Sequence, residues 1–316
     1  MPTEPKRVLV VFYSQTGQLA RVLDSVIGPL DRDPGVVVQR EPLRPVTPYP
    51  FPWKPLEFLD VFPETVALEP PPCVAPGLDG SERFDLVVLG YTVWYLSPAP
   101  PVTGFLQSKV GRQLLAGRPV VTVTACRNMW LTAHETVTGM LRDIGARHCD
   151  HVVLTDQGHA LATFVTTPRW MLTGRKDSVW GLPAAGVAEE DVRGAARFGE
   201  ALREALRRGD ERRGAPMLRG LRACVVDERL IASERIGKRS FNLWRRVIRL
   251  GGPPGAARRK PLLLLYVAVL VTLIVTVVPL GFLTRFLLRP FNAPRLVRLK
   301  RELEAPSGSE TYRLSA

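Results

Sequence analysis

The chain has 316 residues and a formal net charge of +13, which is unevenly distributed. Residues 1–200 hold 19 Lys and Arg against 21 Asp and Glu, a net of −2, which leaves 24 against 9, a net of +15, for residues 201–316. A basic third of this size indicates an anionic partner, either nucleic acid or lipid. The four cysteines and four histidines show no metal-ligand spacing, which argues against a metal site and against a disulfide framework.

The first predicted element is a strand over residues 7–13, where a continuous apolar run is typical of a strand buried on both faces. Apolar residues then recur at helical spacing over residues 18–30. Strand, polar turn and helix in this order direct backbone N–H groups and a helix dipole toward an anion. The turn lacks the lysine of a P-loop and the three glycines of a dinucleotide site, so it fits one terminal phosphate, with an ordinary ligand-free turn as the alternative. The turn consists of Ser14, Gln15, Thr16, Gly17 and Gln18.

Further strands and helices alternate along the chain. The apolar pattern predicts strands at 36–38, 84–90, 119–124 and 151–155, and helices at 127–145 and 189–208. This alternation predicts an α/β fold with a doubly wound, parallel, five-stranded sheet. Ligands of such sheets bind beyond the carboxyl ends of the strands, at the point where the strand order reverses. The segments expected to meet there are residues 14–18, 91–98 and 125–130.

Two insertions interrupt this pattern, at residues 41–80 and 157–187. Both contain aromatic side chains, such as Trp53 and Trp170, which argue for ordered structure. With these insertions the predicted sheet domain spans residues 1–208. A basic amphipathic stretch follows at residues 209–260, for which a membrane-surface helix and a linker helix packed on the domain are the alternatives.

The longest apolar segment runs from residue 261 to residue 288, without a charge between Lys260 and Arg285. About 20 apolar residues suffice to cross a bilayer, and the basic clusters on both flanks fit anionic head groups. The segment therefore predicts a C-terminal membrane helix and argues against nucleic acid as the partner. Because both flanks are basic, a single span and a kinked segment that re-emerges on the same side both stay open. A basic and then polar tail follows at residues 289–316.

The turn at residues 14–18 resembles the phosphate loop of flavodoxins, Thr/Ser-x-Thr-Gly-x-Thr. Ser14, Thr16 and Gly17 match it, whereas Leu19 replaces the last hydroxyl residue and leaves Gln18 as the neighbouring donor. The resemblance implies a flavodoxin-like fold and FMN as the cofactor. The loops after the next two strands would then hold the flavin ring. They contain Thr92, Trp94 and Tyr95, then Cys126, Arg127 and Asn128.

Three sets of residues at the expected binding edge of the sheet are candidates for chemistry. An aromatic such as Trp94 can stack on the ring, or it can simply be a core residue. Asp156 and His159 lie just past the fifth predicted strand and are candidates for proton transfer, with an ordinary polar loop as the alternative. Cys126 can instead be an acyl-carrying nucleophile if His134 serves as its base. His148 and His151 are expected to face solvent.

Longer blocks resemble a bacterial family, the dialkylresorcinol condensing enzymes, over residues 6–208. They are KRVLVVFYSQTGQLARVLDSV, PYPFPWKPLEFLDVFPE, FDLVVLGYTVWYLSPAPPVTGFL, PVVTVTACRNMWLTAHETV and PRWMLTGRK. The resemblance implies a ketosynthase partner, a lipid-like substrate and oxidation of a dialkylcyclohexane-1,3-dione to the aromatic resorcinol. Because the N-terminus lacks signal-peptide features, the resemblance also places the catalytic domain at the cytoplasmic side of the bacterial cytoplasmic membrane. The alternatives are a membrane-tethered quinone reductase or electron-transfer flavoprotein, and a flavin-free scaffold for the ketosynthase.

Overall fold

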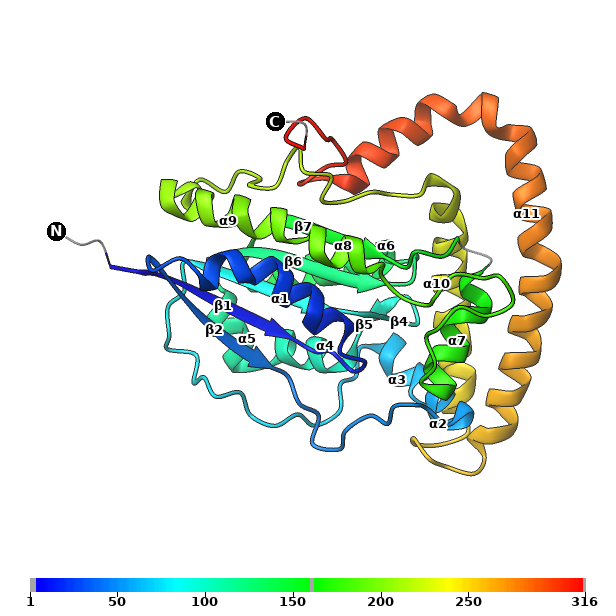
Figure 1. Cartoon of the computed structure of the whole chain (residues 1–316). Helices are drawn as coiled ribbons and strands as arrows, with labels where there is room; N and C mark the ends of the chain where they lie inside the picture. The colour runs from blue at the N-terminus through cyan, green and yellow to red at the C-terminus, as the bar shows by residue number, and fades with distance from the viewer. Residues whose placement is uncertain (1–3, 160–161, 315–316) are drawn as a thin grey trace.

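The computed structural model describes residues 4–159 and 162–314, with the backbone alone for Ile274 and residues 277–296. Its centre is a parallel five-stranded sheet in the order β2-β1-β3-β6-β7 (Figure 1). The strands are β1 (Lys6–Phe12), β2 (Val36–Pro42), β3 (Leu86–Tyr91), β6 (Pro119–Cys126) and β7 (Arg147–Thr155). The predicted α/β fold with five parallel strands is therefore confirmed.

Helices cover both faces of the sheet, which explains why the central strands are apolar without alternation. On one face lie α1 (Gln18–Asp31), α8 (Glu189–Gly194) and α9 (Ala196–Arg208). On the other lie α4 (Pro100–Gln107), α5 (Lys109–Leu115) and α6 (Leu131–Ile144). At the contact of α1 with α9, a Cβ on Gly199 would lie 1.9 Å from the Val26 carbonyl oxygen, so only glycine permits this approach.

The described residues of both insertions form helices, as their aromatic content predicts. Residues 41–80 contain α2 (Pro55–Asp60) and α3 (Phe62–Ala67), and residues 157–187 contain α7 (Thr163–Thr173). A short hairpin of β4 (Val93–Trp94) and β5 (Ser97–Pro98) follows β3. These additions gather at the carboxyl edge of the sheet, near the predicted site (Figure 1).

The C-terminal third adds two helices and a tail. After a 3-10 turn at Asp210–Arg212, α10 (Glu228–Arg249) packs on α3 and α6, and α11 (Arg259–Glu304) follows. The 46-residue α11 arches around the carboxyl edge of the sheet, from α2 and α3 to the edge at β7 (Figure 1). Among the side chains that the structure describes, no helix is long and apolar enough to cross a membrane. The predicted membrane segment at 261–288 lies within α11, and its side chains at Ile274 and 277–288 are outside the described residues.

Several boundaries differ from the predicted ones. The predicted basic amphipathic stretch at residues 209–260 contains α10 over Glu228–Arg249, which packs on α3 and α6 as a linker helix would. Strand β7 begins at Arg147, four residues earlier than predicted, because its first residues are mostly polar although Asp150 among them is buried. Helices α4 and α5 were not predicted, since the prolines and glycines at residues 100–111 hide the helical periodicity.

Candidate functional site

A cavity of about 540 Å³ lies where the three predicted loops meet. Its volume is in the range typical of small-molecule and cofactor sites. The predicted site residues in its wall are Gln15, Thr16, Gln18, Thr92, Trp94, Tyr95, Cys126, Arg127, Asn128 and Asp156. The wall is completed by α7, α10 and α11, which contribute Phe164, Thr167, Trp170, Met171, Ser233, Ile236, Gly237, Ser240, Phe241, Leu270 and Leu273.

The turn after β1 presents the N-terminus of α1 to this cavity. Gly17 is the N-cap residue before α1 and has a left-handed backbone conformation, with φ 79°. As a glycine it has no side chain that could cap the first helical amides. Ser14 Oγ accepts a hydrogen bond from the Ala20 amide at 3.2 Å, so this hydroxyl supports the turn and does not line the cavity.

The two glutamines of the turn tie it to the insertions. Gln15 Nε2 donates to the Pro50 carbonyl at 2.7 Å, and Gln15 Oε1 accepts from Trp53 Nε1 at 3.2 Å. Gln18 Oε1 accepts from the Val187 amide at 3.0 Å. Both side chains are therefore positioned by contacts outside the turn, and Thr16 is the hydroxyl that the turn offers to the cavity.

The loop after β3 is a tight hairpin. Tyr95 and Leu96 both have positive φ, 50° and 57°, which is unusual for residues with large side chains and stores strain. The Trp94 ring packs edge-on against Tyr13, with centroids 6.1 Å apart, and against Tyr49 at 5.0 Å. The Tyr95 hydroxyl donates to the Phe58 carbonyl. The aromatic insertion thus holds the hairpin against the cavity.

Two buried hydroxyls in the wall lack a protein partner. Thr92 Oγ1 in the hairpin and Thr167 Oγ1 on α7 both line the cavity, and neither has a hydrogen-bond partner among the described residues. Buried polar groups are nearly always hydrogen-bonded, because an unmet one costs roughly 1–3 kcal/mol. Their position in the wall fits a polar ligand in the cavity.

The loop after β6 is fixed by α7. Arg127 Nε donates to Thr163 Oγ1 at 2.6 Å, and its guanidinium carbon lies 4.0 Å from the centroid of the Phe164 ring. Burial lowers the pKa of Arg127 to about 10, against the opposing effect of the Asp156 carboxylate. Asn128 Nδ2 also donates to Thr163 Oγ1, at 3.4 Å. Arg127 therefore stays a cation at neutral pH inside the wall.

The two candidates for proton transfer are placed differently. Asp156 lines the cavity, but its oxygens accept from the amides of Gly158 at 2.8 Å and Gly186 at 2.5 Å. Burial raises the pKa of this carboxyl, while these two bonds lower it. His159 is exposed and outside the cavity wall, where its Nδ1 accepts from the Ala162 amide at 3.3 Å. Their role in proton transfer stays a prediction.

The geometry does not activate Cys126 as a nucleophile. Burial raises the pKa of its thiol well above the ordinary value, and the carboxylates of Glu234 and Asp156 raise it further. The proposed base is engaged elsewhere, since the His134 ring stacks on His151 with centroids 3.7 Å apart. Burial also lowers the pKa of His134 to about 3. Cys126 is thus a neutral thiol in the cavity wall.

The expectation that His148 and His151 face solvent was wrong. Thr122 Oγ1 lies 2.9 Å from His148 Nε2, and Thr124 Oγ1 lies 3.2 Å from His151 Nε2. His151 is fully buried, because β7 starts earlier than predicted and carries both rings onto the sheet. No group of His, Cys, Asp or Glu in the described part of the chain has a metal-binding arrangement.

Sequence reasoning missed one side of the cavity. Helices α10 and α11 contribute Phe241, Leu270 and Leu273 to its wall, although they lie far from the sheet domain in the sequence. The helical spacing of apolar residues could have identified the apolar face of α10. It could not have shown that this face packs over the cavity, because that depends on the tertiary structure.

Sheet order and the position of the cavity define the class of fold. The order β2-β1-β3-β6-β7 is the flavodoxin-like form of the doubly wound sheet, and the cavity lies where that order reverses, between β1 and β3. No protein-family model matches the sequence, and no curated protein matches it.

Solved structures similar to this chain are flavoproteins and flavodoxins. A putative flavoprotein from Bacteroides eggerthii DSM 20697 is 17% identical with a TM-score of 0.36, over 47% of this chain and 87% of that one. A flavodoxin from the domain Archaea is 11% identical with a TM-score of 0.35, over 64% and 99%. A flavoprotein in complex with FMN from Lactobacillus acidophilus NCFM is 13% identical with a TM-score of 0.34, over 47% and 91%. These likenesses are too distant to bear on ligand or activity.

Proposed function

We propose that this protein is an FMN-dependent oxidoreductase that acts on an apolar, lipid-like substrate. The observation that carries the proposal is one continuous cavity that is lined both by the turn before α1 and by the loops after β3 and β6. The Thr16 hydroxyl in the turn and the unpartnered hydroxyls of Thr92 and Thr167 fit a ligand with a phosphate at one end and a polar ring at the other.

The residues present would hold FMN by its two ends. The phosphate would lie at the N-terminus of α1, where the helix dipole, the backbone amides and the Thr16 hydroxyl favour an anion. The ring would lie between the hairpin at Trp94 and the loop at Arg127 and Asn128. When bound, FMN would act as a two-electron acceptor that takes a hydride from the substrate.

The remaining wall indicates the substrate class. Phe164, Met171 and Leu270 are apolar, and they face the same cavity as the ring loops. Such a wall favours a substrate with hydrocarbon chains. The substrate we propose is a dialkylcyclohexane-1,3-dione made by a partner ketosynthase.

The proposed reaction converts the dione to a dialkylresorcinol by loss of two hydrogens. A base in the site would take the proton beside a carbonyl, and bound FMN would supply a hydride acceptor for the adjacent carbon, with oxygen or a membrane quinone as the final electron acceptor. Asp156 is the carboxyl in the described wall of this site, and burial raises its pKa, which makes its carboxylate a stronger base. The proposed location is the cytoplasmic side of the bacterial cytoplasmic membrane.

A membrane-tethered quinone reductase is the second candidate, because the same apolar wall fits a quinone. Turnover separates the two. The full-length protein, purified in detergent and loaded with FMN, should convert a synthetic dialkylcyclohexanedione to the resorcinol, measured by mass spectrometry. Reduction of a quinone without conversion of the dione would favour the reductase. A protein that stays colourless and binds no FMN would instead support the flavin-free scaffold.

The cofactor site has its own test. Thr16→Val should weaken FMN binding about 10- to 100-fold, because it removes a charge-assisted bond of roughly 1.5–3 kcal/mol. Isothermal titration of the apo-protein measures this. Thr136→Val is the matched control, since the Thr136 hydroxyl donates to the Thr132 carbonyl on α6 and does not line the cavity. Equal affinity in the two variants would falsify the phosphate site.

A further inference from the structure

The first half of α11 is apolar on two opposite faces. Its inward face buries Leu263 and Tyr266, and further along places Leu270 and Leu273 in the cavity wall. Its outward face exposes Leu264, Val271 and Val275 by 58%, 52% and 67%. A helix that is apolar all round is normally buried in a protein core or a membrane. The outward face therefore needs an apolar partner that the sheet domain does not supply.

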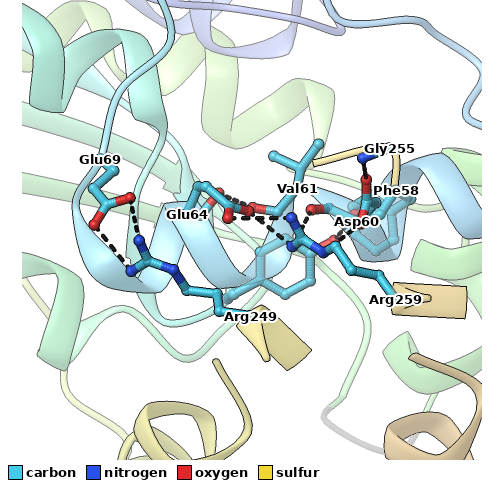
Figure 2. A network of polar contacts seen from close by, with 10 residues as sticks. Phe58, Asp60, Val61, Glu64, Glu69, Arg249, Gly255 and Arg259 are labelled. Atoms are coloured by element: carbon cyan, nitrogen blue, oxygen red, sulfur yellow. Dashed lines mark hydrogen bonds and ion pairs between the residues drawn. The ribbon is translucent and has the colours of Figure 1, made fainter. Parts of the chain in front are cut away.

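The N-terminal end of α11 is anchored to the sheet domain. Arg259 is fully buried, and its guanidinium pairs with Asp60 Oδ1 at 2.9 Å and Glu64 Oε2 at 3.0 Å (Figure 2). Just before it, Arg249 at the end of α10 pairs with both oxygens of Glu69, at 2.9 and 3.0 Å (Figure 2). The Arg259 pairs connect the start of α11 to α2 and α3, and the Arg249 pair connects the end of α10 to the residue that follows the C-cap of α3.

The C-terminal end of α11 returns to the same domain. Glu304 Oε1 accepts from the Val226 amide at 3.0 Å, and Ser307 Oγ donates to Asp150 Oδ1 at 2.8 Å. Ser307 Oγ also accepts from the His151 amide, at 2.7 Å. Both Glu304 and Ser307 are buried. With both ends held on one domain, the helix between them cannot place its ends on opposite sides of a bilayer.

The charge around this helix selects one kind of partner. Between Glu234 and Glu302 the chain has 15 Lys and Arg and no Asp or Glu. An apolar face flanked by cations fits the hydrocarbon edge and anionic head groups of a lipid bilayer. A second copy of this chain would bring the same cations together and be repelled.

We propose that α11 enters an anionic bilayer from one side only, with both ends on the sheet domain, and that the cavity opens toward lipid at Leu270 and Leu273. The chain is then a one-sided membrane protein without a span. Leu273 suits the mouth of the cavity because it lines the wall and is also 39% exposed. Delivery of substrate from the bilayer rests on the proposed function, whereas the topology does not.

Labelling of single cysteines tests the topology in membrane vesicles from expressing cells. In a Cys73→Ser background, Val46→Cys reports on the sheet domain and Tyr312→Cys on the tail, since both side chains are exposed and the other three native cysteines are buried. A membrane-impermeant maleimide should label both variants in inverted vesicles and neither in right-side-out vesicles. Labelling of Tyr312→Cys from the opposite side to Val46→Cys would establish a span and overturn the proposal.

Flotation with purified full-length protein tests the lipid face. The protein should float with vesicles that contain phosphatidylglycerol and much less with pure phosphatidylcholine. Leu264→Glu combined with Val271→Glu and Val275→Glu should reduce the floating fraction at least tenfold. The control, Val37→Glu with Val46→Glu, alters equally exposed residues of the sheet domain and should float normally.

Two further measurements keep the proposal falsifiable. A fluorophore on Val271→Cys should be quenched by brominated acyl chains, and one on Val46→Cys should not; equal quenching would contradict insertion. If the triple variant floats normally but turns a dimer into a monomer in sedimentation, the face is a copy interface and the proposal fails. If the wild-type protein binds FMN but does not float with anionic vesicles, the membrane proposal fails and the proposed function stands. If the wild-type protein floats but does not bind FMN, the proposed function fails and the membrane proposal stands.

Discussion

Strand β3 buries all six of its residues, whereas α11 leaves one apolar face of its first half in solvent. The core of the sheet domain lies between two layers of helices, and one of its two clusters also takes in buried residues of the segment from Met217 to Ala223. The C-terminal third packs apolar side chains such as Ile231 and Tyr266 on this domain and adds polar anchors at Arg259 and Ser307, but it leaves the outward face of α11 uncovered. The strands of the sheet are therefore covered within the fold, whereas the outward apolar face of α11 is not covered by any described part of the chain.

The largest expected effect is in the sheet. Leu89→Ala should lower the free energy of unfolding by about 2–5 kcal/mol, because Leu89 is fully buried on the central strand β3. Leu264→Ala, the same substitution on the exposed face of α11, should change the free energy of unfolding in detergent by no more than about 0.5 kcal/mol. Denaturant titration of both variants checks this. Similar losses in the two would mean that α11 belongs to the cooperative core.

Next in size is the N-terminal anchor of α11. Arg259→Met should lower the free energy of unfolding by about 2–3 kcal/mol, because it leaves Asp60 and Glu64 without their cation. The value is at the low end of the range for a broken buried pair because both carboxylates are partly exposed. Hydrogen exchange should rise in the first turns of α11 and in α2 and α3. Arg298→Met is the control, because Arg298 forms only an exposed pair with Glu302. Unchanged exchange at Arg259→Met would show that the buried pair does not anchor the helix.

The C-terminal anchor should respond to pH. Burial raises the pKa of Asp150 to about 6, although the amides of Met217 and Leu218 and the Ser307 hydroxyl oppose the shift. The folded state therefore holds this proton more tightly than the unfolded chain, so this group loses stabilisation as pH rises from about 4 to about 6. The loss should be at most about 3 kcal/mol. Denaturant titrations of the wild type and of Asp150→Asn across this pH range isolate the contribution of Asp150. If the difference between their free energies of unfolding does not change with pH, Asp150 is not the group that titrates.

The smallest effect is expected at Cys126. If the flavin performs the chemistry, Cys126→Ala should keep most of the dione turnover, because the buried thiol is neutral and is only part of the wall. Intact-protein mass measured during turnover should show no acyl adduct. An adduct on wild-type protein that is absent from the alanine variant would restore Cys126 as a nucleophile.

The sequence predicted the parts of the site that local pattern encodes. Each strand end was visible as an apolar run that stops, so residues 14–18, 91–98 and 125–130 could be placed at one edge of the sheet. It could not place His148 and His151, whose burial depends on the partner rings and hydroxyls of other elements. It also could not distinguish Asp156, in the cavity wall, from His159, which is outside.

The sequence by itself determined the five-stranded α/β fold, the polar turn at the start of α1 and the concentration of positive charge in the last third. These follow from periodicity and composition, which act over a few neighbouring residues. Only the tertiary structure decided that α7, α10 and α11 complete the cavity and that Arg259 and Ser307 hold both ends of α11 on one domain. Such contacts join residues about 80 to 200 positions apart, and their energy depends on the geometry of both partners, which neither local segment encodes.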